Sequence, residues 1–418
     1  VLYELHAMTG NETLASCARL FDKPAFWDPL SRGRDALAGL HANTHLAQVN
    51  GFVARYEATG DDGAKSVVQN FYDILTSSHS FATGGNNWNE FWFAPRTVAD
   101  AVNERNHGDF AQETCTVYNT LKVVRSLFRW TGSADYADYY ERSLLNGILG
   151  VQRKLEPHEV APDGKTLGGG RDPNLQRHLL HADDHDHGHG HVHEHHPLPR
   201  SLYDGQRHLL LAPEDSGSLR LQTGTPIEGS WPALLGSRVG EYLYYTPLGP
   251  ADYRGETEFG GAAGWGSPFD SFWCCYGTSV ESFAKLADSI WFRRGPSLSN
   301  RSTPELVVNL FASSAVSWRE QNLRASMHAD LYSHGEARLR IKLDKLRAGA
   351  EADSSSIRLR LHLRIPAWSQ PARPGSLSLL RQRGEPAAEE PMRCEQERPA
   401  KGGSFCVLGP DWKAGDTV

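Results

Sequence analysis

Ala58-Thr59-Gly60-Asp61-Asp62 is the stretch that decides the fold predicted for the first part of the chain. It leads into a segment whose apolar residues recur every three to four positions, the spacing of helix faces packed on a core. Similar Thr-Gly turns occur within residues 8–12 and 130–134, next to helical patterns. Repeated helix-turn-helix units over residues 1–150 therefore predict an α/α toroid or a solenoid. The apolar positions after the first-named turn are Val67, Val68, Phe71, Tyr72, Ile74 and Leu75.

The C-terminal third of the chain has a different period. Apolar and polar residues alternate over 337–343 and 357–365, which is the signature of half-buried strands. The alternation predicts an antiparallel β-sandwich region over residues 296–418 that is cut short at residue 418. Residues 281–292 have helical spacing, so we expect a helix that directly follows the two adjacent cysteines. The polar positions of the second strand are Arg358, Arg360, His362 and Arg364.

Residues 156–240 have no clear periodicity and are rich in Gly, Pro, Asp and His. Their centre, residues 185–196, is a low-complexity run dominated by His, which can hold transition metals loosely. Its composition cannot bury enough apolar area to fold, so we interpret it as a solvated insertion without a functional metal site. The predicted organisation is α/α helices at 1–155, the His-rich insertion at 156–240, the cysteine-pair motif with a closing helix at 241–295, and the β-sandwich region at 296–418.

Composition is that of an ordinary globular protein and excludes several functions. The 418 residues are 39% hydrophobic and 22% charged, with a formal net charge of −7. Because no basic stripe is present, nucleic acid and anionic membranes are poor partners. No apolar run approaches the roughly 20 residues of a membrane helix, so we expect no membrane span. The sequence begins at Val1 without an initiator methionine, and we therefore expect a fragment whose compartment the sequence leaves open.

Two adjacent cysteines, Cys274 and Cys275, lie in the aromatic stretch 271–277. They can form a strained vicinal disulfide, bind a soft metal, or divide the work between a metal ligand and a nucleophile. They can also be two buried thiols that behave as small hydrophobes. Upstream, Glu113 and Cys115 add a carboxylate and a third thiol two residues apart. Three thiols and one carboxylate are a plausible tetrahedral zinc set, and the spacing alone leaves open whether the site is structural or catalytic.

The remaining cysteines are too few for a disulfide scaffold in a chain of this length. Cys394 and Cys406 can pair in the C-terminal region. Cys17 falls in a helical pattern, so we expect it in the core.

A loop rich in aromatic and amide groups, residues 83–92, lies between the helical units and can face a sugar. It contains Glu90, flanked by Trp88, Phe91 and Trp92, and neighbouring aromatic surface can raise a carboxyl pKa towards the working pH. A zinc-bound thiolate stays deprotonated at neutral pH and is a competent nucleophile. Glu90 is thus a candidate acid/base for a retaining glycosidase. The alternative is a surface carboxylate that caps the following segment.

Several short motifs occur in combination. They are Thr83-Gly84-Gly85 with Glu90-Phe91-Trp92, Glu113-Thr114-Cys115-Thr116-Val117-Tyr118-Asn119, Ser271-Phe272-Trp273-Cys274-Cys275-Tyr276-Gly277-Thr278, His41-Ala42-Asn43-Thr44-His45, Tyr244-Tyr245-Thr246-Pro247-Leu248-Gly249-Pro250 and Leu363-Arg364-Ile365-Pro366-Ala367-Trp368. Together they resemble the zinc-dependent cysteine glycosidases typified by β-L-arabinofuranosidase, glycoside hydrolase family 127 and relatives, in their plant-like branch. The resemblance covers most of residues 35–158 and 240–370.

This resemblance implies an (α/α)6 barrel followed by β-sandwich domains, with the early barrel helices absent from this chain. It implies retaining removal of non-reducing-end β-L-arabinofuranose from an arabinosylated glycan or glycoprotein, and a secreted or secretory-pathway protein. Position by position, Cys274 matches the nucleophile and Glu90 the general acid/base. Glu113, Cys115 and Cys275 match the ligands of Zn²⁺, with Cys274 also at the metal.

Three further residues match or neighbour sugar-contacting positions of the family. His41 and Tyr244 match such positions, and His45 is a further candidate in the same motif. A neutral histidine and a tyrosine hydroxyl suit a furanose because they can hydrogen-bond its hydroxyl groups. Alternatively, each can be a core residue whose polar atoms are hydrogen-bonded, or a residue that supports the metal ligands.

The chain also departs from the family pattern. Asn89 stands where the family usually has glycine before the acid/base, and the stretch from Glu90 to Glu113 is a few residues longer than usual. Residues 158–240 have no recognised counterpart. A hypothesis from another class is a noncatalytic carbohydrate-binding protein that retains the metal site as a structural staple, and a third is a structural zinc protein whose cysteines never meet substrate.

Overall fold

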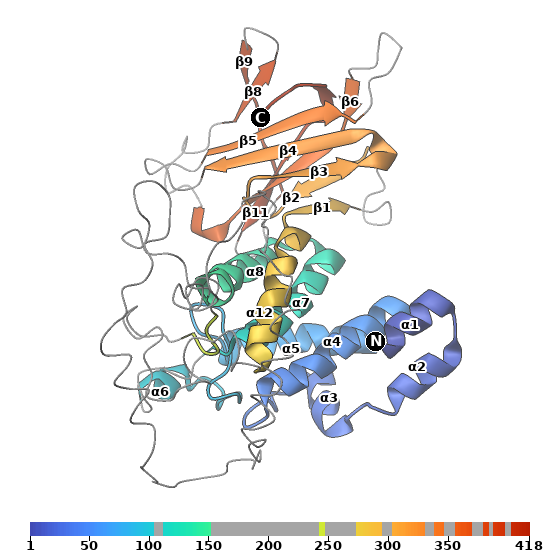
Figure 1. The fold of residues 1–418 in the computed structure, drawn as a ribbon, viewed down its shortest axis with the longest axis vertical. Helices are drawn as coiled ribbons and strands as arrows, with labels where there is room; N and C mark the ends of the chain where they lie inside the picture. The colour runs from blue at the N-terminus through green and yellow to red at the C-terminus, as the bar shows by residue number, and fades with distance from the viewer. Residues whose placement is uncertain are drawn as a thin grey trace, which may run out of the picture. The chain divides into compact units, whose positions relative to one another are not determined.

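The structure is a computed structural model. It describes residues 1–103, 112–151, 242–246, 273–294, 303–330, 338–346, 356–369, 379–383, 388–397 and 403–418. The His-rich insertion predicted at 156–240 lies outside the described residues, and the boundaries of the four predicted regions stay predictions. Within the described parts, helices occupy the N-terminal region and strands the C-terminal region, as the change of sequence period indicates (Figure 1).

The predicted Thr-Gly turns are helix ends. Gly10, Gly60 and Gly132 follow the last residues of α1, α4 and α7, and each has a φ of about +70°. Glycine adopts this left-handed conformation without the strain a Cβ would introduce, which is why each helix ends there. The helices are α1 (Leu2–Thr9), α2 (Glu12–Arg19), α3 (Pro24–Ser31), α4 (Ala42–Thr59), α5 (Asp62–Ser78), α6 (Val98–Asn103), α7 (Thr114–Thr131), α8 (Ala134–Gly147) and α12 (Cys274–Ala284).

The helical part has its own core. Helices α3, α4, α5 and α7 bury one apolar cluster, in which the periodic residues Val67, Val68, Phe71 and Leu75 of α5 are at most 1% exposed. Trp92, at the end of the aromatic loop, packs in the same cluster and is also 1% exposed. The loop that carries Glu90 is therefore anchored to the helical core at its C-terminal end.

Helix α12 begins earlier than predicted. We expected a helix over 281–292 that follows the cysteine pair, but α12 starts at Cys274 and includes both cysteines. It ends at Ala284, and the chain then forms a short 3-10 helix (Leu286–Ser289) before strand β1. Glycine and threonine at positions 277 and 278 weaken the helical pattern of the first turn, so its apolar spacing did not predict the start.

The strands of the described residues form four sheets. A five-stranded sheet has the order β1-β2-β7-β11-β10, and a three-stranded sheet has the order β3-β4-β5. The two small sheets are β12-β6 and β8-β9. The β-rich C-terminal region is as predicted, but the antiparallel expectation is wrong for one pair, because β2 and β7 run parallel. The strands are β1 (Trp291–Arg294), β2 (Glu305–Val308), β3 (Ser314–Trp318), β4 (Leu323–Asp330), β5 (Arg338–Lys345), β6 (Ser356–Arg358), β7 (Arg360–Ile365), β8 (Leu380–Arg383), β9 (Ala388–Pro391), β10 (Glu395–Glu397), β11 (Ser404–Leu408) and β12 (Asp411–Lys413).

Both faces of the five-stranded sheet are covered. Leu361 and Leu363 of β7 join one core with Leu323 of β4 and Leu343 of β5, so this face packs with the three-stranded sheet. On the opposite face, the residues Val307 of β2 and Phe405 of β11 pack with side chains from two helices. Those helix residues are Phe128 of α7 and Ala134 and Ala137 of α8.

Two residues predicted on the polar face of β7 are buried. His362 is 0% exposed and Arg364 is 2% exposed, because helices α7 and α8 cover that face. The charges are paired: Arg364 contacts Asp138 at 2.6 Å and Glu141 at 2.7 Å, both on α8. His362 Nε2 lies 3.0 Å from Glu305 Oε2. The alternation identified the strand correctly but not the environment of its polar side.

Cys394 and Cys406 form the predicted disulfide. Cys17 lies in α2 as predicted, but it is half-buried, and the buried residues of that helix are Ala15 and Ala18. None of the helices in the described ranges is both long and apolar enough to cross a membrane.

The chain returns to the place from which it left the helical part. The backbone N–H of Leu243 donates to the carbonyl of Val151 over 3.0 Å, and the backbone N–H of Thr114 donates to the carbonyl of Tyr244 over 3.0 Å. Residues 242–246 therefore lie against the start of α7, where Glu113 and Cys115 are located.

Candidate active site and metal centre

The first turns of two helices meet at the three cysteines. Glu113 is the N-cap residue of α7 and Cys115 lies in its first turn, while Cys274 and Cys275 are the first two residues of α12. The backbone N–H of Cys115 donates to Sγ of Cys275 over 3.2 Å. Because a helix N-terminus carries partial positive charge, both helices stabilise negative charge on the sulfur atoms and the carboxylate.

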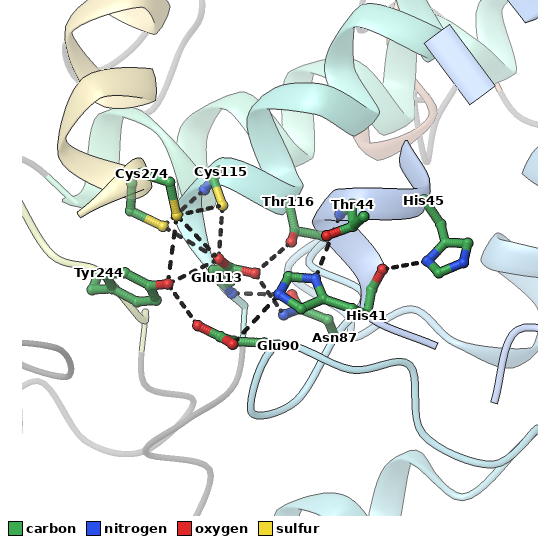
Figure 2. A network of polar contacts seen from close by, with 11 residues as sticks. His41, Thr44, His45, Asn87, Glu90, Glu113, Cys115, Thr116, Tyr244 and Cys274 are labelled. Carbon is green, nitrogen blue, oxygen red and sulfur yellow. Dashed lines mark hydrogen bonds and ion pairs between the residues drawn. The ribbon is translucent and has the colours of Figure 1, made fainter. Parts of the chain in front are cut away.

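The four predicted metal ligands are brought together. Their ligand atoms all lie within 4.8 Å of one another. Figure 2 shows three of the four, Glu113, Cys115 and Cys274. Sγ of Cys115 is 3.6 Å from Sγ of Cys274, and Oε1 of Glu113 is 3.7 Å from Sγ of Cys274 and 3.7 Å from Sγ of Cys275. Two thiolates about 2.3 Å from a tetrahedral zinc ion are about 3.8 Å apart, so the donor set fits such an ion.

The three thiols differ in exposure and in acidity. Cys115 and Cys275 are fully buried and Cys274 is exposed. Burial raises the pKa of Cys115 and Cys275 above the usual range of a thiol, and it raises the pKa of Glu113 to about 6. Hydrogen bonds from Cys115 and then Cys275 hold the pKa of Cys274 far below its usual value. Cys274 is thus the exposed thiol and the one whose pKa is lowered.

Glu90 occupies a two-residue turn between Trp88 and Phe91. The backbone N–H groups of Trp88 and Phe91 each donate to the other's carbonyl, at 2.9 and 3.0 Å. Both central residues have positive φ, 45° at Asn89 and 68° at Glu90, as a type I′ turn requires. Asparagine, the residue at position 89, is among those that best tolerate this conformation.

The carboxylate of Glu90 is held between His41 and Tyr244 (Figure 2). The Tyr244 hydroxyl donates to Oε1 over 2.7 Å, and His41 Nε2 lies 3.4 Å from Oε2. Nδ1 of His41 accepts from the backbone N–H of Thr44, so the proton of a neutral His41 is on Nε2 and points to Glu90.

The pKa of Glu90 differs from the expectation. Aromatic neighbours were expected to raise it, but the hydrogen bond from His41 lowers it, with a further lowering contribution from the hydrogen bond of Tyr244. The same contact raises the pKa of His41. Phe91 is 44% exposed and Trp92 packs in the helical core, so these two aromatic side chains do not enclose the carboxylate. The hydrogen bonds to the carboxylate therefore outweigh its burial.

Tyr244 connects the acid/base candidate with the thiol cluster. Its hydroxyl lies 2.7 Å from Glu90, 3.2 Å from Oε1 of Glu113 and 3.5 Å from Sγ of Cys274. Burial raises its pKa, so the hydroxyl keeps its proton. Tyr244 is held by the backbone contact of its carbonyl with the start of α7.

His45 does not reach this group of residues. Its Nδ1 lies 2.8 Å from the carbonyl oxygen of His41, and its ring packs against Phe26 and Trp92 of the helical core. Figure 2 shows His45 on the far side of His41 from Glu90. The position of His45 is that of a residue supporting the first turn of α4.

Two residues of the site were missed by the sequence analysis. Thr116 donates its hydroxyl to Oε2 of Glu113 over 2.8 Å, and Asn87 donates its side-chain N–H to the same oxygen over 3.3 Å. Thr116 is three residues after Glu113, the spacing at which a first-turn side chain reaches back to the N-cap, and this spacing is a readable signal. Asn87 lies in the amide-rich loop, but its partner is 26 residues away and no local pattern predicts the contact.

Two family models cover most of the chain. The GH127 catalytic domain of β-L-arabinofuranosidases matches residues 1–158 and 232–288, which is more than half of the 418 residues. The chain belongs to this family. The GH127 middle domain matches residues 305–418, the β-rich region. The GH127 resemblance inferred from the motifs is confirmed.

Solved structures of glycoside hydrolases share the fold of this chain. A glycoside hydrolase superimposes with a TM-score of 0.53 at 14% identity, and a GH127 β-L-arabinofuranosidase from Geobacillus stearothermophilus T6 with a TM-score of 0.52 at 15% identity. A GH127 β-arabinofuranosidase gives 0.51 at 16% identity. Each match covers 100% of this chain but only 53%, 52% and 49% of the other, so the chain spans about half their length. No curated protein sequence matches the chain.

Proposed function

We propose that the protein is a retaining β-L-arabinofuranosidase in which Cys274 is the nucleophile and Glu90 the general acid/base. The substrate class is a glycan or glycoprotein with a non-reducing-end β-L-arabinofuranosyl group. The helices belong in this proposal to part of an (α/α)6 barrel, and the strands to a β-sandwich. Support comes from the family and from the chemistry of the residues around Tyr244.

One observation carries the proposal: the thiolate and the carboxylate both contact the same hydroxyl. Tyr244 Oη lies 2.7 Å from Glu90 Oε1 and 3.5 Å from Cys274 Sγ. The separation of Glu90 Oε1 and Cys274 Sγ cannot exceed the sum of these two distances. Paired catalytic groups of inverting glycosidases stand roughly 6.5–9.5 Å apart to admit a water, and those of retaining enzymes roughly 5–5.5 Å. The geometry therefore favours direct attack by Cys274.

In the first step, the Cys274 thiolate attacks the anomeric carbon and the bond to the leaving oxygen breaks. Glu90 gives its proton to that oxygen, so the aglycone leaves as an alcohol. In the second step, Glu90 takes a proton from water, the water oxygen attacks the anomeric carbon, and the thiolate leaves. Each of the two steps inverts the configuration at the anomeric carbon, so the overall reaction retains it.

Two neighbours prepare Glu90 for these proton transfers. His41 Nε2 lies 3.4 Å from the carboxylate, and its N–H stabilises the charged form of Glu90, the form that takes a proton from water in the second step. Tyr244 donates to the other carboxylate oxygen and fixes its direction.

Zn²⁺ fits the four ligands Glu113, Cys115, Cys274 and Cys275, whose donor types are those that bind zinc tetrahedrally. When bound, it supplies a positive charge that keeps the sulfur deprotonated and makes it a better leaving group. The three buried ligands hold the fourth, Cys274, at the exposed side of the cluster.

The test is turnover of 4-nitrophenyl β-L-arabinofuranoside by matched glutamate variants. Glu90→Gln is expected to lower kcat/KM by about 10²–10⁴-fold, the contribution of a general acid/base. Glu57→Gln is the control, because Glu57 has a similar exposure, 35% against 36%, but pairs with Arg129 on the surface. Unchanged turnover in Glu90→Gln would remove Glu90 from the mechanism.

A covalent label tests the nucleophile separately. An electrophilic analogue of arabinofuranose should add one equivalent of mass, and peptide mapping should locate it on Cys274. Labelling that is found only on the half-buried Cys17, or no labelling of an active protein, contradicts the role of Cys274.

A further inference from the structure

The two carboxylate oxygens of Glu113 have different surroundings. Oε1 faces the thiol cluster, the sulfur atoms of the three cysteines, at distances of 2.8, 3.7 and 3.7 Å. Oε2 accepts two hydrogen bonds, one from the hydroxyl of Thr116 over 2.8 Å and one from the side-chain N–H of Asn87 over 3.3 Å. The side chain of Glu113 is 0% exposed, so these protein donors replace water at Oε2.

Both donors are themselves fixed. Thr116 is part of the first turn of α7 and is 0% exposed. Asn87 is also 0% exposed, and its Oδ1 accepts from the backbone N–H of Glu113 over 3.1 Å. Asn87 thus holds the main chain and the side chain of Glu113 at once, and the carboxylate cannot rotate without breaking these contacts.

The loop reaches Asn87 through a close approach. A Cβ at Gly85 would lie 2.3 Å from Cγ of Gln112, the residue before Glu113. The backbone N–H of Gln112 in turn donates to the carbonyl of Asn87 over 3.0 Å. The segment 85–87 is therefore packed directly on the segment that begins α7.

We propose that Asn87 and Thr116 are positioning residues that make Glu113 a one-oxygen metal ligand. By occupying Oε2 they leave Oε1 alone to face the sulfur atoms, so the site offers four donor atoms rather than five. Carboxylates that are free to rotate can bind a metal through one oxygen or two. The inference rests on the proposed function only in that it requires a metal at the thiol cluster.

The test compares three substitutions in α7 of the full chain. Thr116→Val removes the hydroxyl at constant volume, and Thr116→Ser keeps it. Thr120→Val is the matched control, because Thr120 is 1% exposed and its hydroxyl also makes two hydrogen bonds, but neither is to Glu113. Zinc affinity is measured by competition with a chromophoric chelator, and thermal unfolding of the metal-free protein is measured in parallel.

Thr116→Val is expected to lose about 10–100-fold in zinc affinity, the usual effect of removing a hydrogen bond to a metal ligand. Thr116→Ser should bind zinc within a few-fold of the unchanged chain. Thr120→Val should lower the unfolding temperature as Thr116→Val does but leave zinc affinity unaltered. Equal zinc affinity in Thr116→Val and the unchanged chain would overturn the proposal, as would an equal loss in Thr120→Val.

A spectroscopic readout separates positioning from general weakening. Tetrahedral Co²⁺ with thiolate ligands absorbs strongly in the visible range, and a carboxylate that rotates to bind through two oxygens raises the coordination number and weakens these bands. The Co²⁺ bands should weaken in Thr116→Val and in Asn87→Ala at saturating metal. Bands that are identical in all variants contradict the proposal.

These outcomes are distinguishable from failure of the proposed function. A chain that binds zinc as expected but hydrolyses no arabinofuranoside refutes the activity and leaves the role of Asn87 and Thr116 intact. A chain that binds no zinc refutes both.

Discussion

Arg364 is expected to contribute strongly to stability, although the alternating sequence of its strand predicts an exposed side chain at this position. Its side chain is fully buried and donates to Asp138 at 2.6 Å and to the carbonyl of Asn309 at 2.6 Å, and it pairs with Glu141 at 2.7 Å. The perturbation is Arg364→Ala, which leaves two carboxylates facing one another without their cation.

The expected loss of unfolding free energy depends on the hydrogen-bond donors that Asp138 and Glu141 retain. Removing one partner of a buried ion pair typically costs about 3–5 kcal/mol. Here Asp138 keeps the backbone N–H groups of Gly403 and Ala367, and Glu141 keeps the indole N–H of Trp368 at 2.7 Å. Because these donors remain, we expect the lower end of the range, a loss of about 3 kcal/mol.

The assay is urea unfolding followed by tryptophan fluorescence and by circular dichroism. Arg340→Ala is the control, since Arg340 is exposed on β5, and its change should stay within about 0.5 kcal/mol. In a double-mutant cycle, Asp138→Asn should lose most of its own effect once Arg364 is absent. A loss below about 1 kcal/mol in Arg364→Ala would refute the reasoning, because it would mean that the pairing does not offset burial of the charges.

Three further results are expected. In His41→Ala, the basic limb of the pH profile of kcat/KM should move to higher pH, because the hydrogen bond that lowers the pKa of Glu90 is lost and Glu90 keeps its proton to higher pH. An unmoved limb contradicts this role of His41. Gly85→Ala should lower the free energy of unfolding by about 1–3 kcal/mol, because its Cβ overlaps the side chain of Gln112, and equal urea midpoints would argue against this overlap. Asn89→Gly should leave the free energy of unfolding nearly unchanged, whereas Asn89→Val should lower it by about 1–2 kcal/mol because φ at this position is 45°. If calorimetry finds the Val variant more stable than the Gly variant, the type I′ turn is excluded.

Features encoded by local physics were predictable from the sequence. Gly10, Gly60 and Gly132 end helices because only glycine adopts positive φ freely, so the turns alone indicate the helical repeat. The four ligands of the thiol cluster were found from chemical type, although residues 115 and 274 are 159 positions apart. Cysteine is uncommon enough in this chain that its metal chemistry leaves few combinations.

Features set by distant packing were not predictable. Period two identifies β7, but only the helices that cover its second face decide that Arg364 and His362 are buried. The direction of the pKa shift of Glu90 depends on His41, 49 positions earlier, which outweighs the aromatic neighbours in sequence. The roles of Asn87 and Thr116 depend likewise on which carboxylate oxygen faces the sulfur atoms.

The hydrogen bond between Leu243 and Val151 marks a place in the chain where the number of residues can change. Because this bond holds Val151 and Leu243 together, a flexible segment added between them would cost only about 0.6 kcal/mol for each doubling of its length. Insertions, deletions and whole grafted segments can accumulate there while Glu113 and Tyr244 stay in register. This junction is therefore the natural position for attaching an affinity tag or an added binding module.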